Sequence, residues 1–594
     1  MKETVKNLEA LRAVMRSKHV SAVIVPGTDP HQSEYVNDHW KLRDWVTGFT
    51  GSNGTAVVTL DAAGLWTDSR YFLQAEIELA DSGVVLYKEE MPGEPTINEW
   101  LAEHLGENDV LAVDGRLFSL VQANRLEQFC GENGFRFAAD FDPFKDIYKD
   151  RPELPLDAIF EHEVKYAGES TESKISRVMA VVEKQGAEAL LLSALDEIAW
   201  IFNIRCNDVD YNPVAISYAY VSEDRNVLFI DPRKVDAKAA EYLKSCHIDV
   251  LPYDGLQDFL GKLKNVTIML DPNKTSDTVA RWILNCGVVY AASPVALPKA
   301  VKNEVQIEGT HKAMERDGVA LVKLYMWLEK AVAAGGVNEL DVAAKAIEFR
   351  SESPLYRGES FEMIPGYKEH GAIVHYSATK KSASELKPEG LLLVDTGAQY
   401  LDGTTDITRT VALGVPTEEE RHDYTLVLKG HVTLASAIYP EGTRGSQLDA
   451  LARQFLWKEC MTFWHGTGHG VGHFLNVHEG PQNIRLNENP TVLVEGMITS
   501  DEPGLYKTGK HGIRIENLVL ARNYRETEEF GKFMNFEVLT LFPYDSKLID
   551  VALLSDEELA WVNNYHKTVR ERLTPYLNAE QQAWLNEKTK ELKK

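Results

Sequence analysis

The sequence predicts an α/β (α+β) protein in which two similar domains precede a larger domain that carries the functional site. Three observations lead to this prediction: two segments with the same order of elements, two proline-rich connectors, and, after about residue 300, a histidine-rich stretch together with acidic residues that have apolar neighbours. The chain has 594 residues and 44 % of them are hydrophobic. This length and composition are sufficient for several domains with separate apolar cores.

The first two domains are expected to be copies of one unit. Residues 20–76 and residues 187–237 each contain an apolar strand-like run, a Trp-containing element, a further strand-like run and an Asp-x-Arg sequence. Short runs rich in Val, Ile and Leu between turn-forming residues are typical of buried strands. The residue-by-residue match is weak, but the shared order of elements predicts two tandem α/β domains.

Proline-rich polar segments give the predicted boundaries. DRPELPLDAIF follows Lys149, and SPVALPKAVKNEVQ starts at Ser293. Clusters of proline and polar residues mark connections between packed elements. We therefore predict domains at residues 1–150, 151–300 and 301–594. The third domain is expected to open with helices, continue into hairpin-like strands and end in a charged helical extension from about Ser555.

Composition excludes several classes of partner. With 90 acidic and 63 basic residues the formal net charge is −27, which repels nucleic acid and anionic membrane surfaces. The N-terminal sequence predicts an amphipathic helix and lacks the apolar region of a signal peptide, and no run of 18 apolar residues occurs, so we expect a cytoplasmic protein. The five cysteines lack CxxC spacing and are expected to be buried, reduced thiols.

Residues 464–481 contain four histidines and five glycines. His465, His469 and His473 have the spacing of zinc ligands on one helix face, but the four glycines among them would cost a helix about 4 kcal/mol. We therefore expect an extended or looped backbone. In an extended chain each residue spans roughly 3.3 Å, so neighbouring histidines of this set, which are four residues apart, lie ~13 Å from each other. At most one of them can therefore bind a given ion.

Two aspartates lie in a predicted hairpin. Asp395 and Asp406 have apolar or β-branched neighbours, and the turn between them is placed at Asp402–Gly403. In that register Asp406 would face Gln399, so an irregularity at Gly397 is required to bring the two aspartates together. An isolated acidic residue in a strand is usually a solvated edge residue, and this alternative stays open for each aspartate alone.

Two glutamates of the same domain have similar surroundings. Glu502 precedes a predicted Pro-Gly turn, and Glu516 is expected in the middle of a strand. Buried carboxylates require partners. Four of them carry −4 and two divalent cations carry +4, so a site with two ions would be nearly neutral. Mixed oxygen and nitrogen ligation suits Mn²⁺, Co²⁺ or Zn²⁺.

Four motifs carry a family resemblance. VDTGAQYLDGTTDITRT, HGTGHGVGHFLNVHEGP, SDEPGLY and GIRIENLVL, in this order, resemble those of the Xaa-Pro aminopeptidases (aminopeptidase P). The resemblance covers essentially the whole chain and is closest to the three-domain cytosolic type. It implies two creatinase-N-terminal-like domains, a pita-bread catalytic domain with a C-terminal extension, and hydrolysis of the N-terminal Xaa-Pro peptide bond.

The resemblance also implies a metal site with two divalent ions, Mn²⁺ first and Co²⁺ or Zn²⁺ as alternatives. In the family pattern two of the ligands bridge the ions, here Asp406 and Glu516, and Glu502 takes the proton of the attacking water. The five implied ligands are Asp395, Asp406, His469, Glu502 and Glu516.

Other residues receive roles from the same resemblance. His375 and His478 are expected to bind substrate and to move protons at the scissile bond, and His465 to line the site. His473 stands where the family commonly has a small residue, so we expect a structural role for it. Arg514 lies two residues before a ligand and is expected to orient a ligand carboxylate, with a surface ion pair as the alternative.

The sequence departs from the family pattern upstream of His375. The usual Gly- and Asn-containing loop is replaced by IPGYKEHGAIVHY, with Tyr367, Lys368, Glu369 and His370 in its place.

Prolidases and methionine aminopeptidases share the pita-bread site, but the latter lack two such N-terminal domains and the former usually carry one. A metal-free pita-bread binding protein is the other alternative, although all five ligand positions are retained here. We expect peptide substrates and a homodimer formed largely through the catalytic domain.

Overall fold

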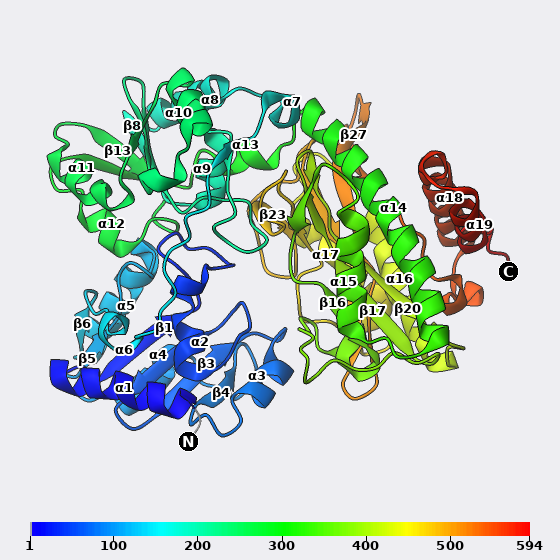
Figure 1. The fold of residues 1–594 in the computed structure, drawn as a ribbon, viewed down its shortest axis with the longest axis horizontal. Coiled ribbons are helices and arrows are strands. Elements are labelled where there is room, and N and C mark those ends of the chain that lie inside the picture. Colours follow the sequence, from blue (N-terminus) through cyan, green and yellow to red (C-terminus); the bar gives the residue numbers. More distant parts are fainter. Residues whose placement is uncertain (1–2) are drawn as a thin grey trace. The chain divides into compact units, whose positions relative to one another are not determined.

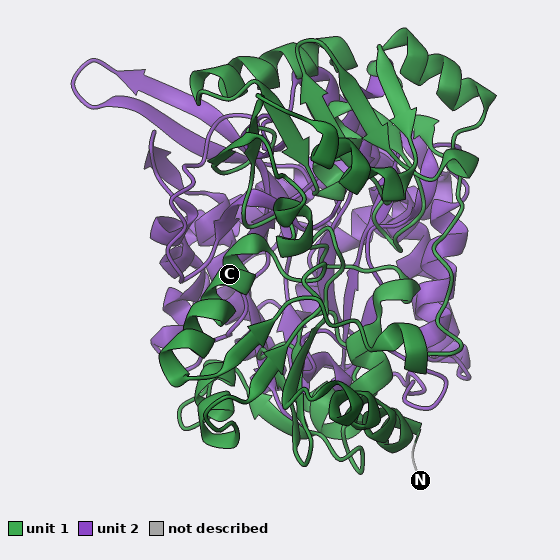
Figure 2. Ribbon diagram, turned by 90° about the vertical axis from the view of Figure 1, so that its left-hand side faces the viewer, with its two compact units in different colours: residues 1–164, 169–295 green, residues 165–168, 296–594 purple. Residues whose placement is uncertain are grey.

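The computed structural model describes residues 3–594, which form two compact units (Figures 1 and 2). Unit 1 comprises residues 1–164 and 169–295, and unit 2 comprises residues 165–168 and 296–594. Among the helices that the structure describes, none combines the length and apolar character needed to span a bilayer.

Unit 1 contains two six-stranded mixed sheets with the same topology. In the first sheet β1 is antiparallel to β2 and parallel to β5, and in the second β8 is antiparallel to β10 and parallel to β13. The predicted repeat is thus confirmed at the level of topology. In spatial order the first sheet consists of β4 (Val85–Lys88), β3 (Ala63–Thr67), β2 (Thr55–Thr59), β1 (Ala22–Pro26), β5 (Val110–Ala112) and β6 (Arg136–Ala138), and the second of β12 (Ile248–Leu251), β11 (Asn226–Phe229), β10 (Tyr218–Ser222), β8 (Ala189–Leu192), β13 (Thr267–Leu270) and β14 (Gly287–Tyr290).

Helices cover these sheets. The predicted N-terminal helix is α1 (Glu3–Lys18), which buries Leu8, Leu11 and Met15 on one face. These positions recur at the helical period, so the amphipathic pattern is satisfied by packing within unit 1. The other main helices of the unit are α2 (Leu42–Thr47), α3 (Phe72–Glu78), α4 (Ile97–His104), α5 (Leu120–Asn133), α8 (Thr171–Lys184), α9 (Leu195–Ile201), α10 (Ala237–Ser245), α11 (Leu256–Lys262) and α12 (Asp277–Arg281).

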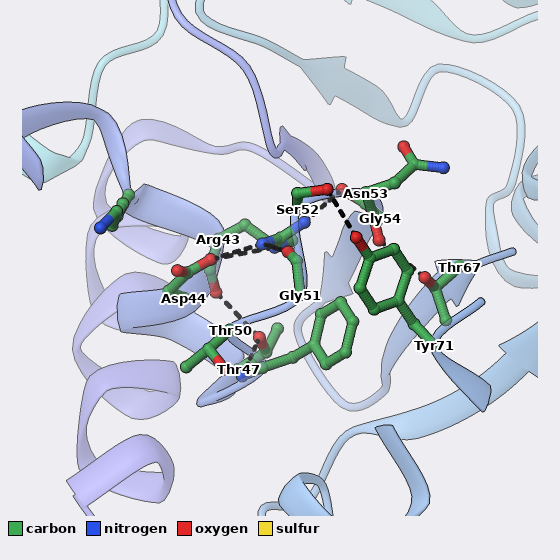
Figure 3. Close-up of polar contacts among 12 residues, drawn as sticks. Arg43, Asp44, Thr47, Thr50, Gly51, Ser52, Asn53, Gly54, Thr67 and Tyr71 are labelled. Carbon is green, nitrogen blue, oxygen red and sulfur yellow. Dashed lines mark hydrogen bonds and ion pairs between the residues drawn. The ribbon is translucent and has the colours of Figure 1, made fainter. Parts of the chain in front are cut away.

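A buried arginine shapes the glycine-rich loop between α2 and β2 (Figure 3). Arg43 donates to the carbonyls of Gly51 and Gly54 and also binds Asp44. In the same loop, Ser52 Oγ lies 2.6 Å from the hydroxyl of Tyr71. Because loop carbonyls here are paired with a guanidinium, the loop has a fixed path despite its glycines.

Both predicted Asp-x-Arg sequences form the same local structure. Arg70 donates to Asp68 at 2.7 Å after β3, and Arg233 donates to Asp231 at 2.6 Å near the end of β11. In each case the aspartate also accepts the backbone N–H of the arginine, which closes a tight turn at the strand end.

The cysteine prediction is partly wrong. Cys130, Cys206 and Cys246 are buried, but Cys286 is half-buried and Cys460 is exposed. Cys460 lies just after a helix end in the left-handed backbone region, with φ of 57°, so it is in a surface turn rather than in a core. All five are free thiols, as expected.

Unit 2 carries long helices beside its sheets, as Figure 1 shows, and two of these sheets are described here. The longest helix, α14 (Glu304–Ala334), begins at a capping box formed by Asn303 and Gln306. It is followed by α15 (Glu339–Arg350), α16 (Glu418–Ala435) and α17 (Gly445–Trp457). In spatial order the first sheet contains β16 (Ile364–Tyr367), β17 (Leu391–Thr396) and β20 (Ile407–Ala412), and the second β21 (Ile438–Pro440), β28 (Gly531–Val538), β27 (Asn517–Thr527), β24 (Ile498–Asp501), β22 (Gly468–Gly470) and β23 (Glu479–Ile484).

The C-terminal extension is helical, as predicted. Ser555 caps α18 (Asp556–Leu573), and α19 (Ala579–Lys588) follows. Buried residues such as Val562 and Val569 face the core of unit 2, so the apolar positions of α18 are covered within the same chain.

Candidate metal centre

The hairpin that carries the two aspartates has a different turn from the predicted one. Tyr400 pairs with Gly403, so the turn residues are Leu401 and Asp402 rather than Asp402–Gly403. Gly403 instead permits the close approach of α14, because an added Cβ would lie 3.0 Å from Ala313 Cβ. The Asp-Gly pair therefore reflects a tertiary contact, which sequence alone did not reveal.

The corrected register brings the aspartates together. Asp395 pairs with Thr408, and Asp406 precedes this position by two residues, so both carboxylates are on one face. The irregularity predicted at Gly397 is confirmed, since β17 ends before it and β18 (Ala398–Tyr400) begins after it. A Cβ at Gly397 would lie 2.1 Å from the carbonyl oxygen of Thr405, so only glycine fits there.

The other three implied ligands lie within or directly beside strands. His469 lies in β22, in a stretch that is otherwise looped, as the glycines predicted. Glu502 joins β24 to β25 (Gly504–Lys507), so no Pro-Gly turn forms there. Glu516 lies between β26 (His511–Arg514) and β27, not in the middle of a strand, because the chain changes sheets at this point.

These side chains converge. His469 Nε2 lies 3.5 Å from Asp406 Oδ2 and 3.3 Å from Glu502 Oε1. Ligand atoms of Asp406, His469 and Glu516 all lie within 4.8 Å of one another, a spacing that could hold a metal ion. Side chains from three separate stretches of the chain, at residues 406, 469 and 502–516, therefore meet in unit 2.

Charge repulsion and burial act on the carboxyl groups together. Burial raises the pKa of Asp406 and of Glu516 well above the usual range, and neighbouring carboxylates, Asp395 among them, raise both further. Burial likewise raises the pKa of Glu502 to about 7, and the carboxylate of Asp395 adds to the increase while Arg514 opposes it. One guanidinium does not balance this much negative charge.

The site fits divalent metal ions. Asp395 Oδ2 accepts a hydrogen bond from Arg514 Nη2 at 2.6 Å, but its Oδ1 is buried and has no hydrogen-bond partner among residues 3–594. A buried carboxylate oxygen without a partner is costly. Cations coordinated by these oxygens and by His469 would remove both this cost and the repulsion, and the mixed donor set suits Mn²⁺, Co²⁺ or Zn²⁺.

Three supporting residues were missed by the sequence reasoning. Thr408 donates to Glu516 Oε2 at 2.8 Å, and Ser500 donates to Glu502 Oε1 at 3.1 Å. Each hydroxyl lies two residues from a ligand in sequence, which puts it on the ligand's side of a strand and was a usable signal. Tyr506, the third, accepts from Arg514 Nη1 at 2.7 Å.

Among the remaining histidines, His478, His465 and His375 are close to residues of the site or follow a residue that contacts one, whereas His473 has its described contact elsewhere. The ring of His478 lies 4.5 Å from that of His469, and His465 Nε2 lies 2.8 Å from the hydroxyl of Tyr506. The half-buried His375 follows Val374, whose carbonyl accepts a hydrogen bond from Arg514 at 3.3 Å.

His473 has its described contact elsewhere. Its Nε2 lies 3.2 Å from the carbonyl oxygen of Tyr166, and the side chain is buried. This contact fits the structural role that we expect for His473.

A buried arginine connects the metal site to the C-terminal extension. Arg409 Nη1 donates to the carbonyl of Glu516 at 2.6 Å, and Nη2 donates to the carbonyl of Phe542 at 2.6 Å and to the hydroxyl of Tyr565 at 2.9 Å. Tyr565 lies in α18, so the backbone position of one metal-site residue depends on the extension.

The raised carboxyl pKa values predict how pH affects the protein without metal. A group with a raised pKa in the folded state stabilises the fold while protonated, and this contribution is lost as pH rises through the folded pKa, about 7 for Glu502. Bound cations reverse the effect. We expect the difference in Tm between Mn²⁺-loaded and metal-free protein to be larger at about pH 8 than at about pH 5.5. Scanning calorimetry would measure it, and a difference that does not change with pH would contradict the prediction.

Family models match the chain along most of its length. The model of metallopeptidase family M24 matches residues 308–523, and that of the C-terminal region of peptidase M24 matches residues 532–592. Two models described as creatinase/prolidase N-terminal domain match residues 7–143 and 150–306.

Full-length relatives agree with these matches. A probable Xaa-Pro aminopeptidase P of Laccaria bicolor is 39 % identical over 98 % of this chain and 92 % of its own, and aminopeptidase P2 of Arabidopsis thaliana is 39 % identical over 97 % and 86 %. The crystal structure of a Caenorhabditis elegans X-prolyl aminopeptidase, described as a cytosolic enzyme with a di-nuclear active site, is 32 % identical with a TM-score of 0.95 and covers 100 % of both chains.

Proposed function

The chain belongs to the Xaa-Pro aminopeptidases of metallopeptidase family M24, and from this premise we propose how it hydrolyses the N-terminal bond of peptides whose second residue is proline. The observation that carries the proposal is the convergence of Asp406, His469 and Glu516, together with a buried oxygen of Asp395 that has no hydrogen-bond partner in the described part of the chain. The residues that would hold two divalent ions, Mn²⁺ in our proposal, are Asp395, Asp406, His469, Glu502 and Glu516.

Bound divalent ions supply the Lewis acid that activates water and polarises the scissile carbonyl. Glu502 is the general base of the proposal, because its carboxylate lies among the proposed ligands, with Oε1 3.3 Å from His469 Nε2, where a metal-bound water would be within its reach. Ser500, which donates to Oε1 of this glutamate, holds the carboxylate in place.

Arg514 and its partners fix the geometry of the site. The guanidinium binds both the ligand Asp395 and the hydroxyl of Tyr506, and Tyr506 in turn contacts His465. Such indirect contacts set the orientation of ligand carboxylates. We assign His465 to the wall of the site, and Arg514 to the orientation of Asp395.

Proton movement at the substrate falls to His478 and His375. His478 lies beside the ligand His469, with 4.5 Å between the rings, and is therefore within reach of the scissile bond. The nitrogen of an Xaa-Pro bond carries no hydrogen, so the site needs no acceptor for an amide N–H, but the departing proline nitrogen must gain a proton. We assign that proton delivery to His478 and substrate binding to His375.

An assay of two substrates tests the proposal against a prolidase-like dipeptidase. We expect release of Arg from an Arg-Pro-Pro peptide, with slower cleavage of an Xaa-Pro dipeptide, by protein whose metal content is measured on the same sample. Cleavage of the dipeptide alone would favour the prolidase alternative. Absence of hydrolysis with both metal sites filled would favour a pita-bread binding protein.

The location and the organisation of unit 1 are also proposals. We propose a cytoplasmic enzyme, in line with the description of its C. elegans relative as cytosolic. We further propose that residues 1–150 and 151–300 are separate domains, each built on one of the two sheets of unit 1.

For assembly we propose a homodimer formed largely through the catalytic domain. Light scattering at micromolar concentration should then give twice the chain mass of 66.7 kDa. A monomer at that concentration would contradict this prediction.

A further inference from the structure

The loop of residues 367–384 carries His375 and begins with residues 367–370, which depart from the family pattern. It starts at the last residue of β16 and passes through the short helix η4 (Lys368–Ala372) before it reaches Ser384. Most of the loop lacks regular secondary structure, so its path depends on side-chain contacts.

One buried carboxylate binds this loop at four places. Glu339, the first residue of α15, has no exposed surface. Its Oε1 accepts from the backbone N–H of Tyr367 at 2.8 Å and lies 2.9 Å from His370 Nδ1. Its Oε2 accepts from the hydroxyl of Tyr376 at 2.9 Å and from the backbone N–H of Ser384 at 2.8 Å. Glu339 thus holds both ends and the middle of the loop.

The carboxylate charge of Glu339 is balanced by a residue of the loop itself. In the described part of the chain the ion-pair partner of Glu339 is His370, and the hydrogen bond to Glu339 raises the pKa of His370. The ring of His370 also stacks on that of Tyr376 at 4.4 Å. A buried carboxylate stabilised mainly by loop donors would be costly if the loop moved away, so carboxylate and loop fix each other.

The contacts place His375 between two anchors. On one side, the carbonyl of Val374 accepts a hydrogen bond from Arg514, which also binds Asp395 of the metal site. On the other side, Tyr376 is held by Glu339. The backbone of His375 is therefore fixed to the metal site through one neighbour and to α15 through the other.

We propose that Glu339 is a positioning residue of the peptidase reaction and that it acts by placing His375 beside the substrate. This inference rests on the proposed function, in which His375 binds the substrate. Two of the residues that depart from the family pattern, Tyr367 and His370, then anchor the loop to Glu339 through a backbone N–H and a ring nitrogen.

The test uses Glu339→Gln in the metal-loaded full chain. The amide group replaces one acceptor oxygen by a donor, so the loop donors on that side lose their partner. We expect kcat to fall about 10- to 100-fold while two ions remain bound, since the altered contacts are with a substrate-binding loop and not with ligands. Glu369→Gln is the matched control, because it removes an exposed carboxylate from the same loop, and its kcat should equal that of the wild type.

A double-mutant cycle separates positioning from a general structural effect. If Glu339 acts through His375, adding Glu339→Gln to His375→Ala should lower kcat by less than about twofold more. The same 10- to 100-fold factor in both backgrounds would overturn the inference alone. Full activity of His375→Ala would instead refute the role of His375 in the proposed function, and with it this inference.

A milder variant keeps the test open if Glu339→Gln does not fold. Tyr376→Phe removes one hydroxyl donor and leaves the carboxylate with its other partners. We expect about a fivefold loss of kcat, the effect of one hydrogen bond, that disappears in the His375→Ala background. A loss of equal size in both backgrounds would overturn the inference here too.

Discussion

Replacing His469 by alanine is expected to lower activity by several orders of magnitude and to remove bound metal, whereas replacing His478 should remove activity alone. His469 Nε2 lies within 3.5 Å of two carboxylates that are proposed ligands. Loss of this ring empties a coordination position and therefore weakens metal binding. His478 lies beside that ring and we assign it no coordination. Its loss should cost roughly 10²- to 10⁴-fold in kcat/KM, the usual range for a proton-transfer contact.

Metal analysis distinguishes the two variants where an activity assay would not. His478→Ala should retain about two ions per chain, and His469→Ala fewer. His473→Ala is the matched control from the same stretch, since its described contact is with Tyr166, and the variant should keep both ions and its kcat. Metal loss in His478→Ala, or two ions in His469→Ala, would show that the roles of these histidines are assigned wrongly.

Removal of metal is expected to abolish activity, and reconstitution should restore it at two ions per chain. Burial raises the pKa of Asp406, Glu502 and Glu516, and the carboxylate of Asp395 raises all three further by repulsion, so we expect the charged form of these groups to require bound cations. We expect activity after chelation to fall by at least about 10³-fold, because the nucleophile is generated by the ions. Mn²⁺ titration followed by elemental analysis measures the stoichiometry.

Two substitutions make this prediction more specific. Asp406→Asn changes a proposed bridging ligand and should weaken binding of both ions, whereas Asp395→Asn should leave about one ion bound. Full activity with fewer than one ion per chain would refute the two-ion proposal.

The sequence predicted the fold well where periodic or compositional signals were local. The helices at both ends of the chain, the repeated unit and the looped histidine stretch follow from apolar periodicity and from glycine content. The predicted position of the turn in the aspartate hairpin was wrong, because Gly403 is required by its close contact with helix α14 and not by the turn. This helix lies more than 60 residues away in sequence. Local patterns do not report such contacts.

The site was predictable in its residues more than in its geometry. The positions of Asp395, Asp406 and His469 came from motifs, but the motifs did not reveal that Glu516 lies at a change of sheet. Nor did they reveal Glu339, which lies 36 residues before His375 and acts across the loop. Hydrogen bonds between distant segments leave no spacing pattern in a single sequence.

The contact of Arg409 with the C-terminal extension has a consequence for synthesis. The ribosome makes the aspartates and His469 well before it makes Phe542 and Tyr565, to which Arg409 donates. Because chains fold from the N-terminus during synthesis, the nascent catalytic unit holds most of its metal-binding side chains while the guanidinium that fixes the Glu516 backbone still lacks its last acceptors. Unit 1 can complete its sheets during this interval, and we expect the metal site to reach its final form only after α18 has been released.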